Sequence, residues 1–194
     1  MVTIAAGTKE IAGRLRAGEA LDIVIAPAPA IEGLITKELL RPDSRIDVAR
    51  SGIGVATHPG GHRYNISSSE ALRKAVLEAK SIGLSAGVSG VYLARLFQQW
   101  GIADRIRSKA ITLPGAPAVA EAVVRGTADI GFLQISEWLP VNGVGFLGAL
   151  PADIQEFTFI TAGLGKSTAN PEAAKMLLNF LISPEAALTK RRPG

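Results

Sequence analysis

Three short turns of this sequence carry the small, glycine-rich and hydroxyl-bearing residues that can bind an anion without a metal. They are Gly7-Thr8-Lys9, the segment 85–90 and the segment 114–117, and each lies between a predicted strand and a predicted helix. Glycine lets a ligand approach the backbone, and the first-turn N–H groups of a helix have no partner within it. Thr8 and Ser89 each add a hydroxyl donor. The turns predict an oxyanion or carboxylate pocket, although the same glycines also serve ordinary chain reversals.

Two basic side chains are further candidates for binding a negatively charged ligand. Arg50 lies in a predicted strand, where its guanidinium could hold a ligand carboxylate with two parallel hydrogen bonds. Pairing with a nearby acidic residue is the alternative for this side chain. Lys9 lies at a predicted helix start, where a cation opposes the helix dipole, and its alternative is a solvated first-turn residue.

Several other kinds of chemistry find no motif in the sequence. Without cysteine, disulfides, zinc–thiolate sites and thiol catalysis are excluded. Gly52 and Gly54 lack the third glycine of a dinucleotide-binding fingerprint because Thr57 occupies its place, and no phosphate-binding P-loop or Gly-x-Ser-x-Gly motif occurs. His58 and His62 are separated by Pro-Gly-Gly, which forbids the helix that could align them on a metal. We therefore expect no metal and no cofactor.

Composition and charge indicate a folded protein with no strong attraction to nucleic acid. The 194 residues are 47% hydrophobic and 20% charged, which is too apolar for a disordered chain. The net charge is +4, and three of the positive charges are the consecutive residues 190–192. Such a short basic tail is typical of a solvated chain end, so a nucleic-acid partner is not expected.

The positions of the candidate residues depend on an alternation of short apolar strands and amphipathic helices. Strands are predicted at 2–6, 21–26, 46–57, 81–84, 110–113, 129–133, 144–147 and 157–164. Helices are predicted between most of them, with a capping box at Ser67-x-x-Glu70 and helix ends at Gly18, Gly101 and Gly126. This order predicts an α/β protein with mainly parallel sheet, in which ligands bind at the carboxyl ends of the strands.

The sequence resembles the periplasmic solute-binding proteins of bacterial ABC importers, in the branch similar to molybdate-binding proteins. The segments that carry the resemblance cover nearly the whole chain: 7–9, 16–25, 44–56, 89–97, 122–132 and 170–186. The resemblance implies a two-lobed type II periplasmic binding fold, with each lobe a mainly parallel sheet flanked by helices. One lobe would contain residues 1–57 and 155–194, the other residues 58–154, with a hinge near 54–58 and 153–158. The ligand would bind in the cleft between the lobes.

The family's oxyanion contacts can be transferred to individual positions of this sequence. Together with the turn residues and Arg50, the full set of predicted ligand-binding residues is Gly7, Thr8, Lys9, Arg50, Ser89, Gly90, Ala116 and Gln134. Molybdate binders usually place a tyrosine where this chain has Gln134, so a donor is kept but the pocket changes shape. Family members also begin with a strand and a helix before the Gly-Thr segment. The resemblance therefore predicts that a first strand–helix unit is missing here.

The resulting hypothesis is a solute-binding component of an ABC importer that captures a small anion, either a molybdate-like oxyanion or a small carboxylate. It would act in the periplasm with a membrane permease as partner, although no secretory signal follows Met1. An exposed sheet edge would allow two copies to dimerise. Two alternatives stay open: an aconitate isomerase-like enzyme on the same scaffold, with Arg50 holding a carboxylate, and the ligand-sensing domain of a transcription regulator.

Overall fold

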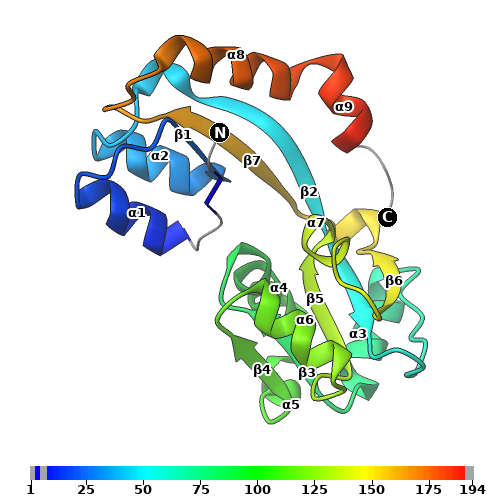
Figure 1. Cartoon of the computed structure of the whole chain (residues 1–194). Coiled ribbons are helices and arrows are strands. Elements are labelled where there is room, and N and C mark those ends of the chain that lie inside the picture. Colours follow the sequence, from blue (N-terminus) through cyan, green and yellow to red (C-terminus); the bar gives the residue numbers. More distant parts are fainter. Residues whose placement is uncertain (1–2, 5–7, 191–194) are drawn as a thin grey trace. The chain divides into compact units, whose positions relative to one another are not determined.

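Two strands carry the chain between two compact units in the computed structural model, which describes residues 3–4 and 8–190 (Figure 1). Unit 1 contains residues 1–50 and 159–194, and unit 2 contains residues 51–158. The strands that continue across this division are β2 (Ile46–Thr57) and β7 (Phe157–Leu164). The resemblance placed the lobe boundaries at 57/58 and 154/155, and these boundaries and the hinge near them stay predictions.

Unit 1 is built on the antiparallel pair of β1 (Ile23–Pro27) with β7, in which Ile23 lies opposite Leu164. Alternate side chains of β1 point to opposite faces, so Val24 packs with α2 on one face. On the other face, Leu164 packs with α8. The remaining elements of unit 1 are α1 (Thr8–Arg16), α2 (Ala28–Thr36), η1 (Pro42–Ser44), α8 (Pro171–Ile182) and α9 (Pro184–Lys190).

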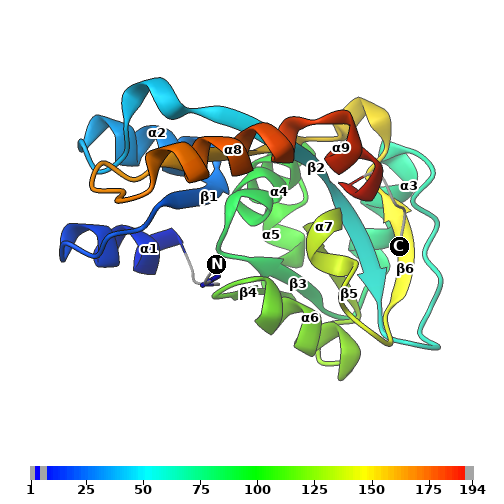
Figure 2. The same ribbon diagram turned by 45° about the horizontal axis from the view of Figure 1, so that its top comes forward.

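Unit 2 is a sheet with an apolar core on each side. Figure 2 shows its strands and helices from a second direction. Phe97 and Phe132 belong to the larger core, where their rings meet edge to face with centroids 6.1 Å apart. The elements between β2 and β7 are α3 (Ser69–Glu78), β3 (Ile82–Ser85), α4 (Val88–Gln99), α5 (Ala103–Ile106), β4 (Ala110–Leu113), α6 (Ala116–Val124), β5 (Ile130–Gln134), α7 (Ile135–Trp138), β6 (Gly145–Ala149) and η2 (Ala152–Ile154).

Strand direction in unit 2 decides where the candidate residues meet. β3 pairs in parallel with both β4 and β5, so the carboxyl ends of these three strands lie at one edge of the sheet. β2 instead pairs antiparallel with β5 and with β6. The expected parallel pairing therefore holds for β3, β4 and β5, whereas the described pairs of β1 with β7 and of β2 with β5 and β6 are antiparallel.

Several local predictions are confirmed and two are corrected. Gly101 and Gly126, predicted to end helices, have the left-handed φ values of 65° and 74° that glycine adopts without strain. Thr3 and Ile4, the described part of the first predicted strand, belong to no strand, and the rest of that segment lies outside the described residues. The cap of α3 was also predicted one residue too early, because Ser68 rather than Ser67 accepts a hydrogen bond from the backbone of the first turn, at 3.1 Å.

The corrected cap leads to a direct test of stability. We expect Ser68→Ala to lower the free energy of unfolding by about 1 kcal/mol, because it removes the side-chain acceptor of the Ala71 N–H. Ser67→Ala is the matched control, since its hydroxyl does not cap the helix. Urea unfolding followed by circular dichroism measures both variants, and a larger loss for Ser67→Ala would contradict the corrected cap.

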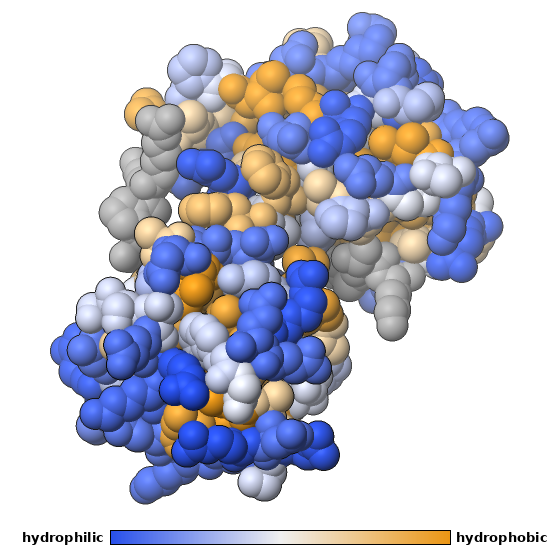
Figure 3. All heavy atoms as spheres, turned by 180° about the vertical axis from the view of Figure 1, so that it is seen from behind, coloured by the Kyte–Doolittle hydropathy of each residue, from blue (hydrophilic) through white to orange (hydrophobic). Residues whose placement is uncertain are grey.

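The described residues contain no helix that could span a membrane, and they leave the predicted dimer contact untested. None of the helices in residues 8–190 is long and apolar enough to cross a bilayer. On the face that Figure 3 shows, apolar residues lie among hydrophilic ones. β1 lies at one end of the hydrogen-bonded strand order β1-β7-β2-β5-β3-β4 and is therefore an edge strand. Pairing of two copies through such an edge stays a prediction.

Candidate functional site

The turns that precede α4 and α6 lie against each other at the carboxyl edge of the unit 2 sheet. β3 ends at Ser85 and α4 begins at Val88, while β4 ends at Leu113 and α6 begins at Ala116. The N–H of Ala86 donates to the Leu113 carbonyl at 2.8 Å, which joins the two turns directly. Two helices, α4 of 12 residues and α6 of 9 residues, therefore begin side by side at this edge.

A buried pair of serine hydroxyls forms the centre of the site. The hydroxyl oxygens of Ser85 and Ser89 are 3.2 Å apart, and both side chains are buried. Ser85 Oγ also accepts the N–H of Gly87 at 3.3 Å, which fixes its place in the turn. Each hydroxyl carries one hydrogen, and the bond between the two hydroxyls uses only one of these hydrogens. The other O–H can therefore donate a hydrogen bond to a ligand.

The close packing of α4 onto the end of β3 depends on Gly90. A Cβ at this position would lie 1.7 Å from the carbonyl oxygen of Ser85, closer than any non-bonded atoms approach. Only glycine lets the helix begin this near the strand, and this closeness brings the hydroxyls of Ser85 and Ser89 together. Gly90 therefore acts on the site through the backbone, because it has no side chain to offer a ligand.

The donors at this edge are neutral, and they suit an anion of small size. First-turn N–H groups of α4 and α6 point out of the helix ends, where the helix dipole favours negative charge. Pro117 removes one donor from α6, so α4 offers the more complete set. Val88 and Val91 are exposed at the start of α4 and add apolar surface beside these donors.

Gln134 lies at the same edge, but its side chain turns toward β2 and β7. We call these two strands, which continue from one unit into the other, the crossover strands. In the amide orientation that gives every atom a partner, its nitrogen donates to the carbonyls of Ser51 at 2.8 Å and Gly52 at 3.2 Å. Its oxygen accepts the Thr158 hydroxyl at 2.8 Å. Its backbone N–H donates to Glu137 Oε2 at 3.0 Å. The donors of Gln134 are thus used within the protein, and its predicted contact with a ligand stays a prediction.

The predicted residues fall into two groups. Ser89, Gly90, Ala116 and Gln134 belong to unit 2, and the structure brings them to one edge of its sheet. Arg50 is exposed at the end of the unit 1 part of β2. Thr8 and Lys9 begin α1, with side chains outside what is described, and Gly7 lies outside the described residues. A ligand role for these residues of unit 1 stays a prediction.

Glu137, in α7, is the acidic residue that follows the carboxyl end of β5. Desolvation raises the pKa of its carboxyl, and the hydrogen bond from the Gln134 N–H only partly opposes that shift. The neighbouring Trp138 is buried and donates its indole N–H to the Gly54 carbonyl at 3.1 Å. Trp138 therefore packs inside unit 2, whereas the Glu137 carboxylate accepts a proton more readily than that of an ordinary glutamate because its pKa is raised.

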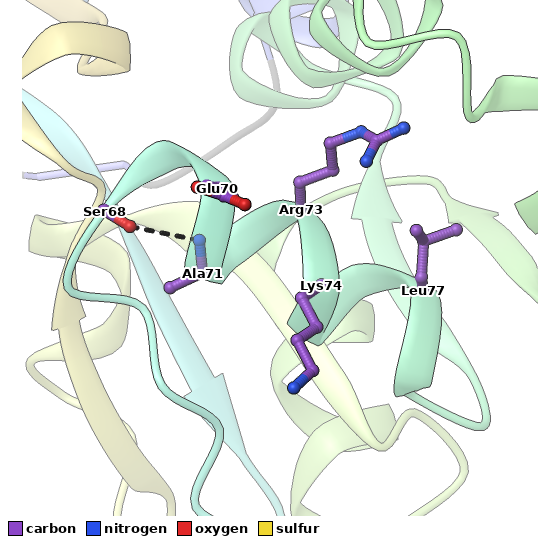
Figure 4. A pocket seen from close by; sticks show the side chains of 6 residues that line it. All are labelled: Ser68, Glu70, Ala71, Arg73, Lys74 and Leu77. Atoms are coloured by element: carbon purple, nitrogen blue, oxygen red, sulfur yellow. Dashed lines mark hydrogen bonds between the residues drawn. The ribbon is translucent and has the colours of Figure 1, made fainter.

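A separate hollow lies on the surface of α3 and contains none of the predicted site residues (Figure 4). Its lining includes the cap residue Ser68 and the side chains of Glu70, Arg73 and Lys74. Arg73 donates to the Trp100 carbonyl at 3.4 Å, and Lys74 pairs with Glu78 at 3.7 Å. These contacts are those of a solvated helix face, so this hollow adds nothing to the ligand site.

Sequence reasoning missed two residues that shape the site. Ser85 was seen only as part of a turn, although a serine four residues before Ser89 across a glycine turn is a signal that could have identified the pair. Gln155 holds the backbone of β2 at Ile53, from 102 residues away in the sequence. No local pattern marks such a contact, because it depends on how distant segments pack.

Comparison with known families and curated proteins gives two matches. The family model described as bacterial extracellular solute-binding protein matches residues 1–194. A curated aconitate isomerase from a Pseudomonas species is 34% identical over 178 residues, which are 91% of this chain and 68% of that protein.

Solved structures resemble this chain over most of its length. The substrate-binding domain of a putative molybdenum ABC transporter from Clostridium difficile has a TM-score of 0.72 and 17% identity, covering 97% of this chain and 82% of that one. The periplasmic molybdate-binding protein of Azotobacter vinelandii has a TM-score of 0.74 and 17% identity, covering 93% and 80%. At 17% identity these structural likenesses show the fold alone, and they confirm the predicted type II periplasmic binding fold.

Proposed function

Because this chain belongs to the bacterial extracellular solute-binding protein family, we propose that it binds a small anionic solute and delivers it to the permease of an ABC importer. The observation that carries the proposal is the Ser85–Ser89 hydroxyl pair at the start of α4. Family members bind solutes outside the cytoplasm, and we place this protein there as part of the proposal.

Neutral donors favour an anion that is captured and then released. The hydroxyl pair and the first-turn N–H groups of α4 and α6 stabilise negative charge without a buried cation, whose desolvation would cost several kcal/mol. A site of this kind distinguishes ligands by the number and position of their oxygen atoms. A molybdate-like oxyanion and a small carboxylate both fit this description, and the names of the relatives include both classes.

Titration calorimetry with the purified chain tests this proposal. The ligands are sodium molybdate, tungstate, sulfate, phosphate and the carboxylates citrate and trans-aconitate. We expect heat of binding from at least one of them, and about tenfold weaker binding by Ser89→Ala, since a hydrogen bond to a charged group contributes about 1.5 kcal/mol. Ser108→Ala is the control, because Ser108 is exposed and precedes the start of β4, away from the carboxyl ends of the strands. The absence of binding to every ligand would overturn the proposal.

An isomerase is the second candidate, and the relative named aconitate isomerase favours it. Moving a double bond along a tricarboxylate requires a base that removes a proton from the carbon next to the double bond. The proton is then returned at the other end, so no cofactor or redox partner is needed. Among the described residues at the carboxyl edge, Glu137 is the candidate base because its pKa is raised. Arg50 is the candidate partner of a substrate carboxylate.

The isomerase candidate predicts loss of turnover in Glu137→Gln. We expect this variant to bind trans-aconitate with unchanged affinity and to convert it at least about a hundredfold more slowly, because general base catalysis contributes about that factor or more. The wild-type rate should rise with pH through a pKa above that of an ordinary glutamate, since the base acts in its deprotonated form. NMR spectra of the substrate follow the conversion, and an equal rate in the variant would exclude Glu137 as the base.

A further inference from the structure

Side-chain amides add to the backbone partners of β2 where this strand enters unit 2. The β2–β6 ladder ends at Gly54, and one residue earlier Gln155 binds both backbone groups of Ile53. Its Oε1 accepts the Ile53 N–H at 2.7 Å, and its Nε2 donates to the Ile53 carbonyl at 3.0 Å. Gly52 leaves room for this amide, because a Cβ there would lie 2.9 to 3.1 Å from its atoms. The Ile53 carbonyl also accepts the backbone N–H of Leu150 at 2.9 Å, so Gln155 shares this carbonyl with the backbone and binds the Ile53 N–H with its own oxygen.

A second side-chain amide adds to the other edge of β2. The β2–β5 ladder ends at the pair of Ile53 with Gln134, and the Gln134 amide nitrogen continues to the carbonyls of Ser51 and Gly52. Its oxygen accepts the hydroxyl of Thr158, the last residue of unit 2 on β7. One buried amide thus holds β2 where it enters unit 2 and β7 where it leaves unit 2.

From these contacts we infer that Gln134 and Gln155 are positioning residues that restrain the segment 51–53 while allowing it to twist. A ladder hydrogen bond joins two backbones and fixes their register. A glutamine amide sits on a side chain with rotatable bonds, so it can follow a change in the backbone angles of its partner and keep the bond. The polar groups of segment 51–53 would then stay satisfied during such a twist, which avoids the cost of unpaired buried groups.

The link to the candidate site runs through Gln134. This residue ends β5, whose carboxyl end lies beside the end of β3 with its Ser85–Ser89 hydroxyl pair. The amide contacts therefore connect the backbone at that edge with segment 51–53 of β2. A functional consequence for ligand binding rests on the proposed function, whereas the restraint on β2 stands on the contacts alone.

Amide hydrogen exchange in the whole chain tests the restraint. Gln155→Met keeps most of the side-chain volume and removes both bonds to Ile53. We expect the Ile53 N–H to exchange about tenfold faster in this variant, as follows from the loss of one buried hydrogen bond. Gln155→Glu keeps an oxygen that accepts this N–H but sets a second acceptor against the Ile53 carbonyl, so we expect exchange there to rise in this variant as well. Gln98→Met, at an exposed glutamine of α4, is the control for the substitution itself.

Affinity separates a positioning role from a purely structural one. Sodium molybdate and trans-aconitate are titrated into the wild type, the single variants and Gln134→Met/Gln155→Met, well below the melting temperature of each. We expect the double variant to bind whichever probe binds the wild type at least about tenfold more weakly. A Kd within twofold of the wild-type Kd would overturn the positioning role. If neither probe binds the wild type, the proposed function loses its support for these ligands, and exchange alone decides the restraint. Unchanged exchange of the Ile53 N–H in Gln155→Met overturns the inference in either case.

Discussion

Gly90→Ala is expected to lower the free energy of unfolding by about 3 kcal/mol or more and to abolish anion binding. The new methyl group would lie 1.7 Å from the Ser85 carbonyl oxygen, so either α4 or the end of β3 must move. Overpacking of a well-packed interior typically costs about 1–3 kcal/mol, and here the obstacle is backbone rather than a side chain that could rotate away. Movement of α4 would also separate Ser89 from Ser85.

Gly33→Ala is the matched control for this substitution. Gly33 lies in the middle of α2, and a Cβ there meets nothing within 4 Å. The same change should therefore raise stability by about 0.5–1 kcal/mol, because alanine loses less conformational freedom than glycine in a helix. Urea unfolding followed by circular dichroism compares the two variants. If Gly90→Ala were as stable as the wild type, the close approach of α4 to β3 would be wrong.

Elements with a strong apolar pattern could be predicted from the sequence nearly to the residue. The long strand 46–57 and the strand 157–164 have the same bounds in the structure as in the prediction. Both are rich in β-branched or aromatic residues. The last long helix likewise begins at Pro171, as the preference of proline for the first helical turn predicts.

The cap of α3 shows where local pattern stops being sufficient. Ser67, Ser68 and Ser69 are consecutive, and each is chemically able to cap a helix. The glutamate three residues after Ser67 favoured that serine. In the structure the Ser67 N–H is instead bound by the Asn65 side chain at 2.9 Å, and the helix begins one residue later. A neighbouring turn therefore decided the choice between equivalent residues.

Gln134 shows the same limit at the candidate site. Its position at the end of a strand could be predicted, and so could its place at the ligand edge of an α/β sheet. The direction of its side chain depends on Ser51 and Thr158, which are distant in the sequence. They come close because β2 pairs with β5, which ends at Gln134, and because β7 lies next to β2 in the sheet. Main-chain features of the site were thus accessible from the sequence, whereas the partners of its amides were not.

A negative charge introduced at Val88 is expected to weaken anion binding strongly while leaving the fold intact. Val88 is the first residue of α4 and is 45% exposed, so an aspartate there meets water and a favourable helix dipole. Stability should therefore stay equal or rise slightly. Two like charges about 6 Å apart repel by about 3 kcal/mol at an effective dielectric constant of about 20, and exposure to solvent reduces this value. We expect Val88→Asp to raise the Kd at least about tenfold.

Val88→Asn isolates the charge, because asparagine has the shape of aspartate and is neutral. We expect it to change the Kd far less than Val88→Asp does. The difference between the two variants should shrink as ionic strength rises, since salt screens exposed charges over about 10 Å at 0.1 M. Calorimetric titrations at low and high salt measure this difference with whichever anion binds the wild type. Equal affinities of the two variants at low salt would show that the anion does not bind at the start of α4, even if the chain binds it elsewhere.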